Sequence, residues 1–309
     1  MSRARAHAFA TRARTRGIAF VLVLWVIAML SILLGSFSLI ARTENLQSRH
    51  LFDTTQARYA AEAGLNLAIF ELRKTDPMQK WIADGRPYRF GYGDAEIEVS
   101  INDDSGKIDI NTAANNGDLL TNLFVTHGVD LDHAIALSDA IKDWIDADDL
   151  KQPNGAEAED YKAAGLNYVP KNAPFDTVSE LQQVLGMTYD LYSKIEPAIT
   201  IYSGRSTPNA GFGNADALRA MYPDATPEQI EQLVQQIQSQ PPGADPGGVL
   251  APDGTPIMAG GGGLTYSVKS RAKLPNGATT VLDATIRMGG VSSAGRPFVI
   301  LRWRDGETS

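Results

Sequence analysis

The stretch Arg16-Gly17-Ile18-Ala19-Phe20 opens the part of the sequence that decides the fold, because its glycine begins a run of 25 uncharged residues, 17–41. Five arginines and no acidic residue precede the run. At about 1.5 Å of rise per residue, a helix of this length spans roughly 37 Å, more than the ~30 Å hydrocarbon core of a bilayer. The segment is therefore predicted to cross a membrane, with the arginines on its cytoplasmic side.

Three interpretations of this segment compete. A cleaved secretory signal has a shorter apolar core and a small-residue cleavage site, whereas Arg42-Thr43-Glu44 follows here. A plain single-pass anchor explains the apolar run but not the glycine at its boundary. The third interpretation is a type IV prepilin-like leader, residues 1–17, which a prepilin peptidase cuts after Gly17 to leave Ile18 as a methylated N-terminus. Glycine suits such a site because, without a Cβ, it lets a protease approach the backbone closely.

The residue at the fifth position after this cleavage is Leu22, where most pilin-like proteins carry a glutamate. A carboxylate inside a membrane is costly unless it is paired, and the glutamate of pilin-like proteins pairs with the N-terminal amine of the neighbouring subunit above it. A subunit with nothing above it needs no such carboxylate. Leu22 therefore indicates a subunit at the tip of a helical assembly.

The composition agrees with an exported, folded protein. The 309 residues allow one large or two small domains, and a hydrophobic content of 43% is enough for a core. The absence of cysteine excludes disulfides, thiolate catalysis and cysteine zinc sites. Removal of the five leader arginines takes the net charge from −8 to −13, which disfavours binding to a phosphate backbone and favours cations or basic partners.

Beyond the apolar run, residues 41–74 contain no proline and one glycine. Apolar side chains recur there at helical spacing, at Phe52, Tyr59, Ala63, Leu67 and Phe70. We predict a single helix of roughly 55 residues whose second half packs on a soluble domain and which stops at Asp76-Pro77. Two separate helices with a break near Arg42 are the alternative.

The strand signals lie far apart in the sequence. Residues 95–101 alternate polar and apolar side chains and predict a first strand, and 265–274, 278–288 and 297–303 predict three more. Pro275-Asn276-Gly277 is a strong hairpin turn. Because edge strands need partners, the simplest closure pairs the first strand with the C-terminal set and leaves the intervening residues as a mainly helical insertion.

Local signals place helices inside this insertion. They are a possible helix start at Asn111-Thr112-Ala113, a helix over 131–145, a further start over 175–181 with Thr177 and Glu180 at capping-box spacing, and two helices within 214–240. Residues 241–263, rich in glycine and proline, predict a linker or mobile loop. The fold class is α+β, and the predicted parts are a leader (1–17), a transmembrane half-helix (18–42), a body (43–104), the insertion (105–263) and the C-terminal strands (264–309).

Five motifs together carry a resemblance to a known family. They are 16–20 with Leu22, Ser105-Gly106-Lys107-Ile108-Asp109-Ile110-Asn111-Thr112-Ala113, Asp143-Trp144-Ile145-Asp146-Ala147-Asp148, Gly155-Ala156-Glu157 and Asn172-Ala173-Pro174-Phe175-Asp176. The chain resembles the minor pseudopilin K family of bacterial type II secretion, general secretion pathway protein K. The resemblance implies a pilin-like body with a helical insert, a calcium site, and a place at the pseudopilus tip with minor pseudopilins I and J and the major pseudopilin.

An acidic segment within the insertion is the one candidate for ion chemistry. Seven carboxylates fall within 143–160, with Lys151 as the only cation among them. Oxygen ligands at Asp146, Asp148 and Asp149, with a turn at 153–155 that brings Glu157 back, suit a cation that takes six to eight oxygens, as calcium does. The spacing is not that of an EF-hand, and magnesium fits less well. A solvated acidic helix end is the alternative.

Other classes of function receive less support. The segments 111–113 and 180–187 resemble pieces of helix-hairpin-helix nucleic-acid-binding modules, but their surroundings are acidic, so no nucleic-acid binding is expected. His127 and His133 have no partner in a catalytic pattern, so no enzyme is predicted. We expect a filament-initiating or capping subunit, anchored once in the inner membrane with its bulk in the periplasm. A type IV pilus minor pilin is the alternative within the same class.

Overall fold

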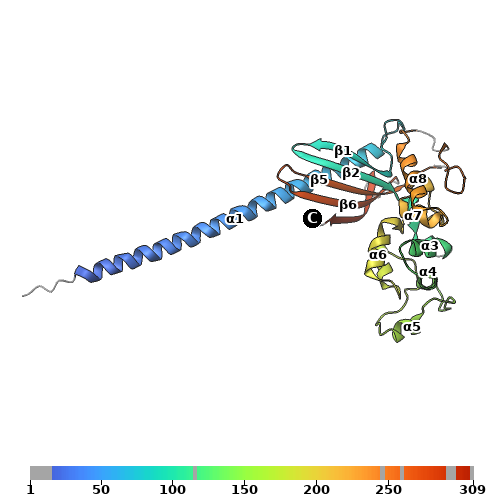
Figure 1. Ribbon diagram of the computed structural model, residues 1–309, viewed down its shortest axis with the longest axis horizontal. Coiled ribbons are helices and arrows are strands. Elements are labelled where there is room, and N and C mark those ends of the chain that lie inside the picture. Colours follow the sequence, from blue (N-terminus) through green and yellow to red (C-terminus); the bar gives the residue numbers. More distant parts are fainter. Residues whose placement is uncertain (1–15, 114–116, 244–247, 258–260, 290–296, 307–309) are drawn as a thin grey trace, which may run out of the picture. The chain divides into compact units, whose positions relative to one another are not determined.

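The computed structural model describes residues 16–113, 117–243, 248–257, 261–289 and 297–306. The chain divides into two compact units, Met1–Thr55 and Gln56–Ser309, which are described separately. One helix, α1 (Arg16–Leu72), passes through both (Figure 1). The prediction of a single helix is therefore confirmed, and the alternative with a break near Arg42 is wrong. Gly17 and Ile18 lie in the first turn of α1, whereas leader residues 1–15 lie outside the described residues.

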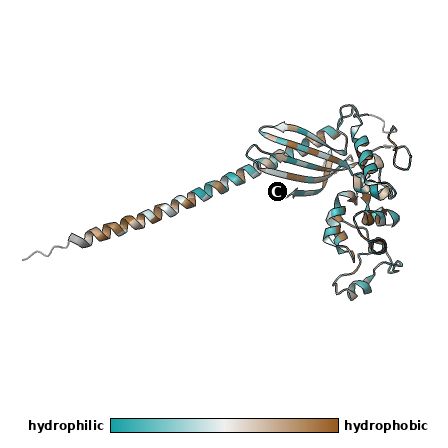
Figure 2. Ribbon diagram, in the orientation of Figure 1, coloured by the Kyte–Doolittle hydropathy of each residue, from teal (hydrophilic) through white to brown (hydrophobic). Residues whose placement is uncertain are grey.

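The first unit carries the apolar half of α1. Figure 2 shows this half of the helix mostly in the colours of hydrophobic residues. From Ala19 to Ala41 every side chain is exposed, including Phe20 at 70% and Leu22 at 61%. Within the described part of the chain, α1 is the one helix long and apolar enough to cross a membrane. A surface of this kind is stable in a bilayer and costly in water, because the apolar area has no protein partner.

The second unit is built on a five-stranded antiparallel sheet. Its strands follow the order β1 (Asp84–Tyr92), β2 (Ala95–Asp103), β5 (Thr265–Lys273), β6 (Thr279–Met288) and β7 (Phe298–Gly306). β2 pairs with β5, with Ile101 opposite Val268, so the predicted pairing of the first predicted strand with the C-terminal set is confirmed. The predicted hairpin forms between β5 and β6, where Gly277 takes a positive φ of 91°.

β1 was not predicted from the sequence. The strand predicted over 95–101 is therefore the second strand of the chain and not the first. Pro87 interrupts the alternation that marks a strand, and a β-bulge lies between Asp84 and Pro87. Proline has no N–H to donate and is tolerated in strands at a sheet edge, which is where β1 lies. At the sheet edge a strand can contain Pro87, and the proline breaks the alternation by which the sequence would have revealed the strand.

The packed face of α1 also differs from the prediction. Tyr59 and Phe70 of the predicted stripe are 64% and 62% exposed. The sheet contacts a neighbouring face made mainly of small residues, Ala57, Ala60, Ala61, Leu65, Ala68, Ile69 and Leu72, which are all buried. Gly64 lies on this face, and a Cβ there would come 2.9 Å from Cγ2 of Ile97 and 3.1 Å from Cγ2 of Val99. This face packs against the sheet because its small side chains let the helix axis come close to the strands.

The insertion lies between β2 and β5 and is mainly helical, as predicted. Its elements are η1 (Asp104–Gly106), β3 (Ile108–Asp109), α2 (Ile110–Ala113), α3 (Gly117–Thr126), α4 (Leu131–Ile145), α5 (Ala158–Ala163), η2 (Val178–Gln183), α6 (Tyr189–Ile195), η3 (Glu196–Ala198), β4 (Ile199–Thr200), η4 (Ala210–Phe212), α7 (Ala215–Met221) and α8 (Pro227–Ser239). β3 and β4 pair in parallel. The insertion and the sheet belong to one compact unit, so the insertion is not a detached domain.

Most of the helices predicted within the insertion are present in the structure. α4 has the predicted bounds, and Thr177 with Glu180 forms the predicted capping box, although the turn it starts is a 3₁₀ helix. A helix does start near 111–113 as predicted, but α2 begins one residue earlier, at Ile110. There the side chain of Asp109 accepts a hydrogen bond from the N–H of Asn111 at 3.1 Å.

The glycine-rich return segment packs more than expected. Val249, Ala251 and Ile257 are buried in a small apolar cluster with Ile230 and Leu233 of α8. An isolated bridge between Leu250 and Pro256 closes the turn between them. Residues 248–257 therefore form a packed turn and not a free linker, whereas 244–247 and 258–260 lie outside the described residues.

Candidate functional site

The acidic loop between α4 and α5 is held in place by the core of the insertion. Trp144, in the last turn of α4, is 3% exposed, and its ring lies 6.0 Å from that of Phe175 and 6.1 Å from that of Tyr161. One residue earlier, Oδ1 of Asp143 accepts a hydrogen bond from the N–H of Gln152 at 3.0 Å. Trp144 therefore anchors the loop in the core of the insertion, and both contacts fix the start of the loop.

Several oxygen atoms in this loop are buried without a hydrogen-bond donor. Among the described residues they include Oδ1 of Asp146, Oε1 of Glu157, Oδ2 of Asp143 and the amide oxygen of Asn172. A buried oxygen without a donor costs about 1–3 kcal/mol, so such atoms point to an ion or water that supplies the missing interaction. A cation that takes oxygen ligands would supply the interaction that these buried oxygens lack.

The electrostatics of the loop agree with that chemistry. Burial raises the pKa of Glu157, and the carboxylates of Asp143, Asp146 and Asp149 raise it further. Burial also raises the pKa of Asp146, with Asp148 as its next largest cause. These carboxylates repel one another, and a divalent cation among them would remove both the repulsion and the cost of burial.

The four predicted ligands fall into two groups. Asp146 and Glu157 have a buried oxygen without a donor, whereas Asp148 and Asp149 are engaged through Oδ1. Oδ1 of Asp148 accepts from the N–H of Leu150 at 2.9 Å, and Oδ1 of Asp149 accepts from Nδ2 of Asn172 at 3.0 Å. In the described part of the chain, no three acidic or histidine side chains are gathered closely enough to hold a metal by themselves.

Asn172 is the site residue that sequence reasoning missed. It takes a φ of 50°, a left-handed conformation that asparagine tolerates better than most residues. Its amide nitrogen bonds to the acidic loop while its amide oxygen stays buried without a donor. The amide could therefore complete a set of oxygen ligands with Asp146 and Glu157. The motif Asn172-Ala173-Pro174 was a signal, but its distance of 23 residues from Asp149 concealed the contact.

Lys151, the one cation in the acidic run, does not neutralise this group. Its Nζ lies 2.7 Å from Oδ1 of Asp160, and this hydrogen bond is the main cause of the lowered pKa of Asp160. Lys151 therefore does not supply a positive charge to Asp146 and Glu157, whose buried oxygens lack donors.

The fold places the chain in the class of α+β proteins in which a long N-terminal helix packs on an antiparallel sheet. The model of a protein family described as type II secretion system (T2SS), protein K, matches residues 100–204. Type II secretion system protein K of Klebsiella pneumoniae is 30% identical over 205 residues, which are 60% of this chain and 62% of that protein. The protein of the same name from Pseudomonas aeruginosa is 25% identical over 239 residues, 71% of either chain.

A solved structure has the same fold. A chain in the crystal structure of the GspK-GspI-GspJ complex from enterotoxigenic Escherichia coli matches with a TM-score of 0.54 and 20% identity, over 86% of this chain and 99% of that one. Over these regions the chain described here is similar to type II secretion system protein K. The matched region spans about three fifths of the Klebsiella relative, 62% of its length.

Proposed function

We propose that the chain is a minor pseudopilin that sits at the tip of the type II secretion pseudopilus and starts or caps its assembly. The observation that carries the proposal is α1, whose exposed apolar half is joined to a half that packs on a sheet. The first half supplies a membrane anchor from which a subunit can be drawn into a helical bundle. Leu22 supports the tip position, because a first subunit has no neighbour whose amine needs a carboxylate.

The partners follow from this role. The matching solved structure is a complex with GspI and GspJ, so pseudopilins I and J are the proposed neighbours, with the major pseudopilin below them. Prepilin peptidase would cut between Gly17 and Ile18. The arginines before the apolar run favour a cytoplasmic N-terminus and a periplasmic body.

One experiment tests both processing and partners. The chain is co-expressed with prepilin peptidase and pseudopilins I and J of its own secretion system, extracted from membranes and purified through a C-terminal tag. We expect a methylated N-terminus at Ile18 and recovery of I and J. A Gly17→Leu variant is the control, since it should keep its leader. An intact Met1 would contradict the pseudopilin pathway, and recovery of pilus subunits instead of I and J would favour a type IV minor pilin.

We further propose that the acidic loop binds calcium in a structural role. Asp146, Glu157 and Asn172 supply buried oxygens that lack donors, and Asp148 and Asp149 add negative charge beside them. Calcium would offset the repulsion among these groups and hold the loop against the core around Trp144. No catalytic step is assigned to the ion.

Calorimetric titration of the purified chain with calcium tests this site. We expect a saturable heat that Asp146→Ala abolishes, because the variant removes a buried oxygen ligand. Calcium at a hundred times its Kd should also stabilise the protein by about 2.7 kcal/mol. Glu159→Ala is the matched control, because Glu159 is an exposed acid near the same loop. If both variants keep the heat of the parent chain, the loop is not the site.

A further inference from the structure

Among the described residues, the helical insertion and the sheet belong to separate buried apolar clusters. One cluster joins α1 to the sheet, and two others lie within the insertion. The cluster of α1 and the sheet has no residue in common with either of the others. The two bodies are joined mainly by polar and charged side chains, although apolar side chains such as Ile199 and Leu301 also lie between them. We call the polar set the polar seam: Arg86, Asp103, Asp104, Lys107, Glu196, Thr200, Gln238, Ser267, Asp283, Arg302 and Arg304.

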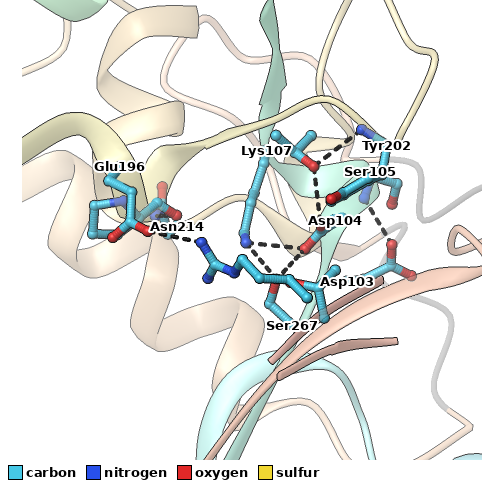
Figure 3. A network of polar contacts seen from close by, with 12 residues as sticks. Asp103, Asp104, Ser105, Lys107, Glu196, Tyr202, Asn214 and Ser267 are labelled. Atoms are coloured by element: carbon cyan, nitrogen blue, oxygen red, sulfur yellow. Dashed lines mark hydrogen bonds and ion pairs between the residues drawn. The ribbon is translucent and has the colours of Figure 1, made fainter. Parts of the chain in front are cut away.

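Two adjacent aspartates occupy the centre of the seam (Figure 3). Asp104 is 1% exposed; its Oδ1 accepts from Oγ of Ser267 on β5 at 2.7 Å and lies 3.0 Å from Nζ of Lys107. Its Oδ2 accepts from Oγ1 of Thr200, inside the insertion, at 2.8 Å. One carboxylate thus holds the sheet and the insertion together.

Asp103 binds both connections between the sheet and the insertion, the one that leaves β2 and the one that returns to β5. Its Oδ1 accepts from the N–H of Ser105 on the outgoing crossing at 2.8 Å. Its Oδ2 accepts from the N–H of Gly263 on the returning crossing at 2.8 Å. Because both crossings meet at one buried side chain, any movement of the insertion must turn about this point.

The outer part of the seam is a set of ion pairs over β6 and β7. Glu196 of the insertion lies 2.8 Å from Arg302 and 3.2 Å from Arg304, and Asp283 of β6 pairs with both arginines. The side chains of Arg302 and Arg304 are 32% and 51% exposed, so salt can screen these pairs. A cavity of about 370 Å³ is lined by Glu196, Arg302 and Arg304 of the outer pairs and by Asp104.

The far side of the seam, at β1, is polar as well. Nη1 of Arg86 donates to the carbonyl oxygen of Gln240 at 3.0 Å, and Nε2 of Gln238 donates to that of Asp84 at 3.2 Å. These contacts join the C-terminal end of α8 to the sheet edge. Hydrogen bonds of this kind exchange readily for bonds to water, unlike the burial of apolar surface.

We propose that the polar seam is a latch, and that the insertion turns as one body about the Asp103–Asp104 junction when the outer ion pairs open. A polar interface around a cavity binds two bodies less firmly than an apolar one, and relative motion is the expected behaviour of such pairs. The buried aspartates keep the pivot in place because their bonds are shielded from solvent. This device belongs to the second unit and does not depend on which filament the chain enters.

Distances between spin labels test the latch in the full-length chain in detergent. The chain has no cysteine, so labels can be placed without background at Lys162→Cys in the insertion and Lys273→Cys in the sheet, both exposed. At low salt we expect one narrow distance distribution. High salt, or Glu196→Gln at low salt, is expected to broaden it and add a population at a shifted distance, because each weakens the ion pairs of Glu196 with Arg302 and Arg304, the outer pairs that join the insertion to the sheet.

Two controls separate a latch from unfolding. A second label pair inside the insertion, Lys162→Cys with Leu131→Cys, should keep its distribution in Glu196→Gln, since the insertion moves as one body. Glu159→Gln removes an exposed acid away from the seam and should leave both distributions unchanged. If Glu196→Gln and high salt leave the distance between insertion and sheet unchanged, the seam is a fixed joint and the proposal is wrong.

Discussion

Replacement of Lys107 by methionine is expected to lower the free energy of unfolding by about 3 kcal/mol or more, within the range for breaking a buried ion pair. The side chains of Lys107 and Asp104 are only 12% and 2% exposed. The variant leaves the Asp104 carboxylate buried without its countercharge. Hydrogen bonds from Ser267 and Thr200 remain, so the loss should lie toward the low end of the range.

Chemical denaturation of the full-length chain in detergent measures this loss. Lys151→Met is the matched control, because Lys151 also pairs with an aspartate but the two side chains are 46% and 32% exposed. A surface pair contributes about 0–1 kcal/mol. Equal losses in the two variants would mean that burial at the seam does not strengthen the Lys107–Asp104 pair.

Replacement of Gly64 by leucine should separate α1 from the sheet and destabilise the second unit by about 3 kcal/mol, the upper part of the usual range for overpacking. Even a Cβ at this position would collide with Oγ of Ser270 and come close to Ile97 and Val99. These residues belong to the central strands and are buried, so they have little room to move. The better helix propensity of leucine offsets only about 1 kcal/mol of that cost.

Urea denaturation monitored by circular dichroism checks this effect. Asn66→Leu is the control, because Asn66 lies on the exposed face of the same helix, two residues away. It should shift stability by no more than about 0.5 kcal/mol. A Gly64→Leu protein as stable as Asn66→Leu would contradict the close packing of helix and sheet.

Short-range patterns account for the parts of the fold that were predicted correctly. The capping box of Thr177 and Glu180 spans four residues, and η2 begins directly after Thr177, where this spacing predicts a start. The β5–β6 hairpin depends on a turn in which Gly277 takes a positive φ. Such signals act between near neighbours, so the sequence displays them directly.

Contacts between distant residues account for the parts that were missed. The apolar spacing on α1 favoured the large side chains Tyr59 and Phe70, but the sheet selected the face with alanines and Gly64. Asn172 reaches Asp149 across 23 residues. Nothing in local periodicity distinguishes the face of a helix that packs from one that stays exposed when both carry apolar residues.

The amino-acid sequence was enough to predict the long apolar half of α1, the α+β class, the insertion and the acidic loop, because apolar run length, strand alternation and charge density are properties of contiguous residues. The tertiary structure alone decided which face of α1 meets the sheet, which oxygens of the acidic loop stay without donors, and how the insertion is held. The last of these rests on Asp104, whose partners Thr200 and Ser267 are 96 and 163 residues away. A buried carboxylate needs donors wherever the folded chain can supply them, and only the folded chain brings these together.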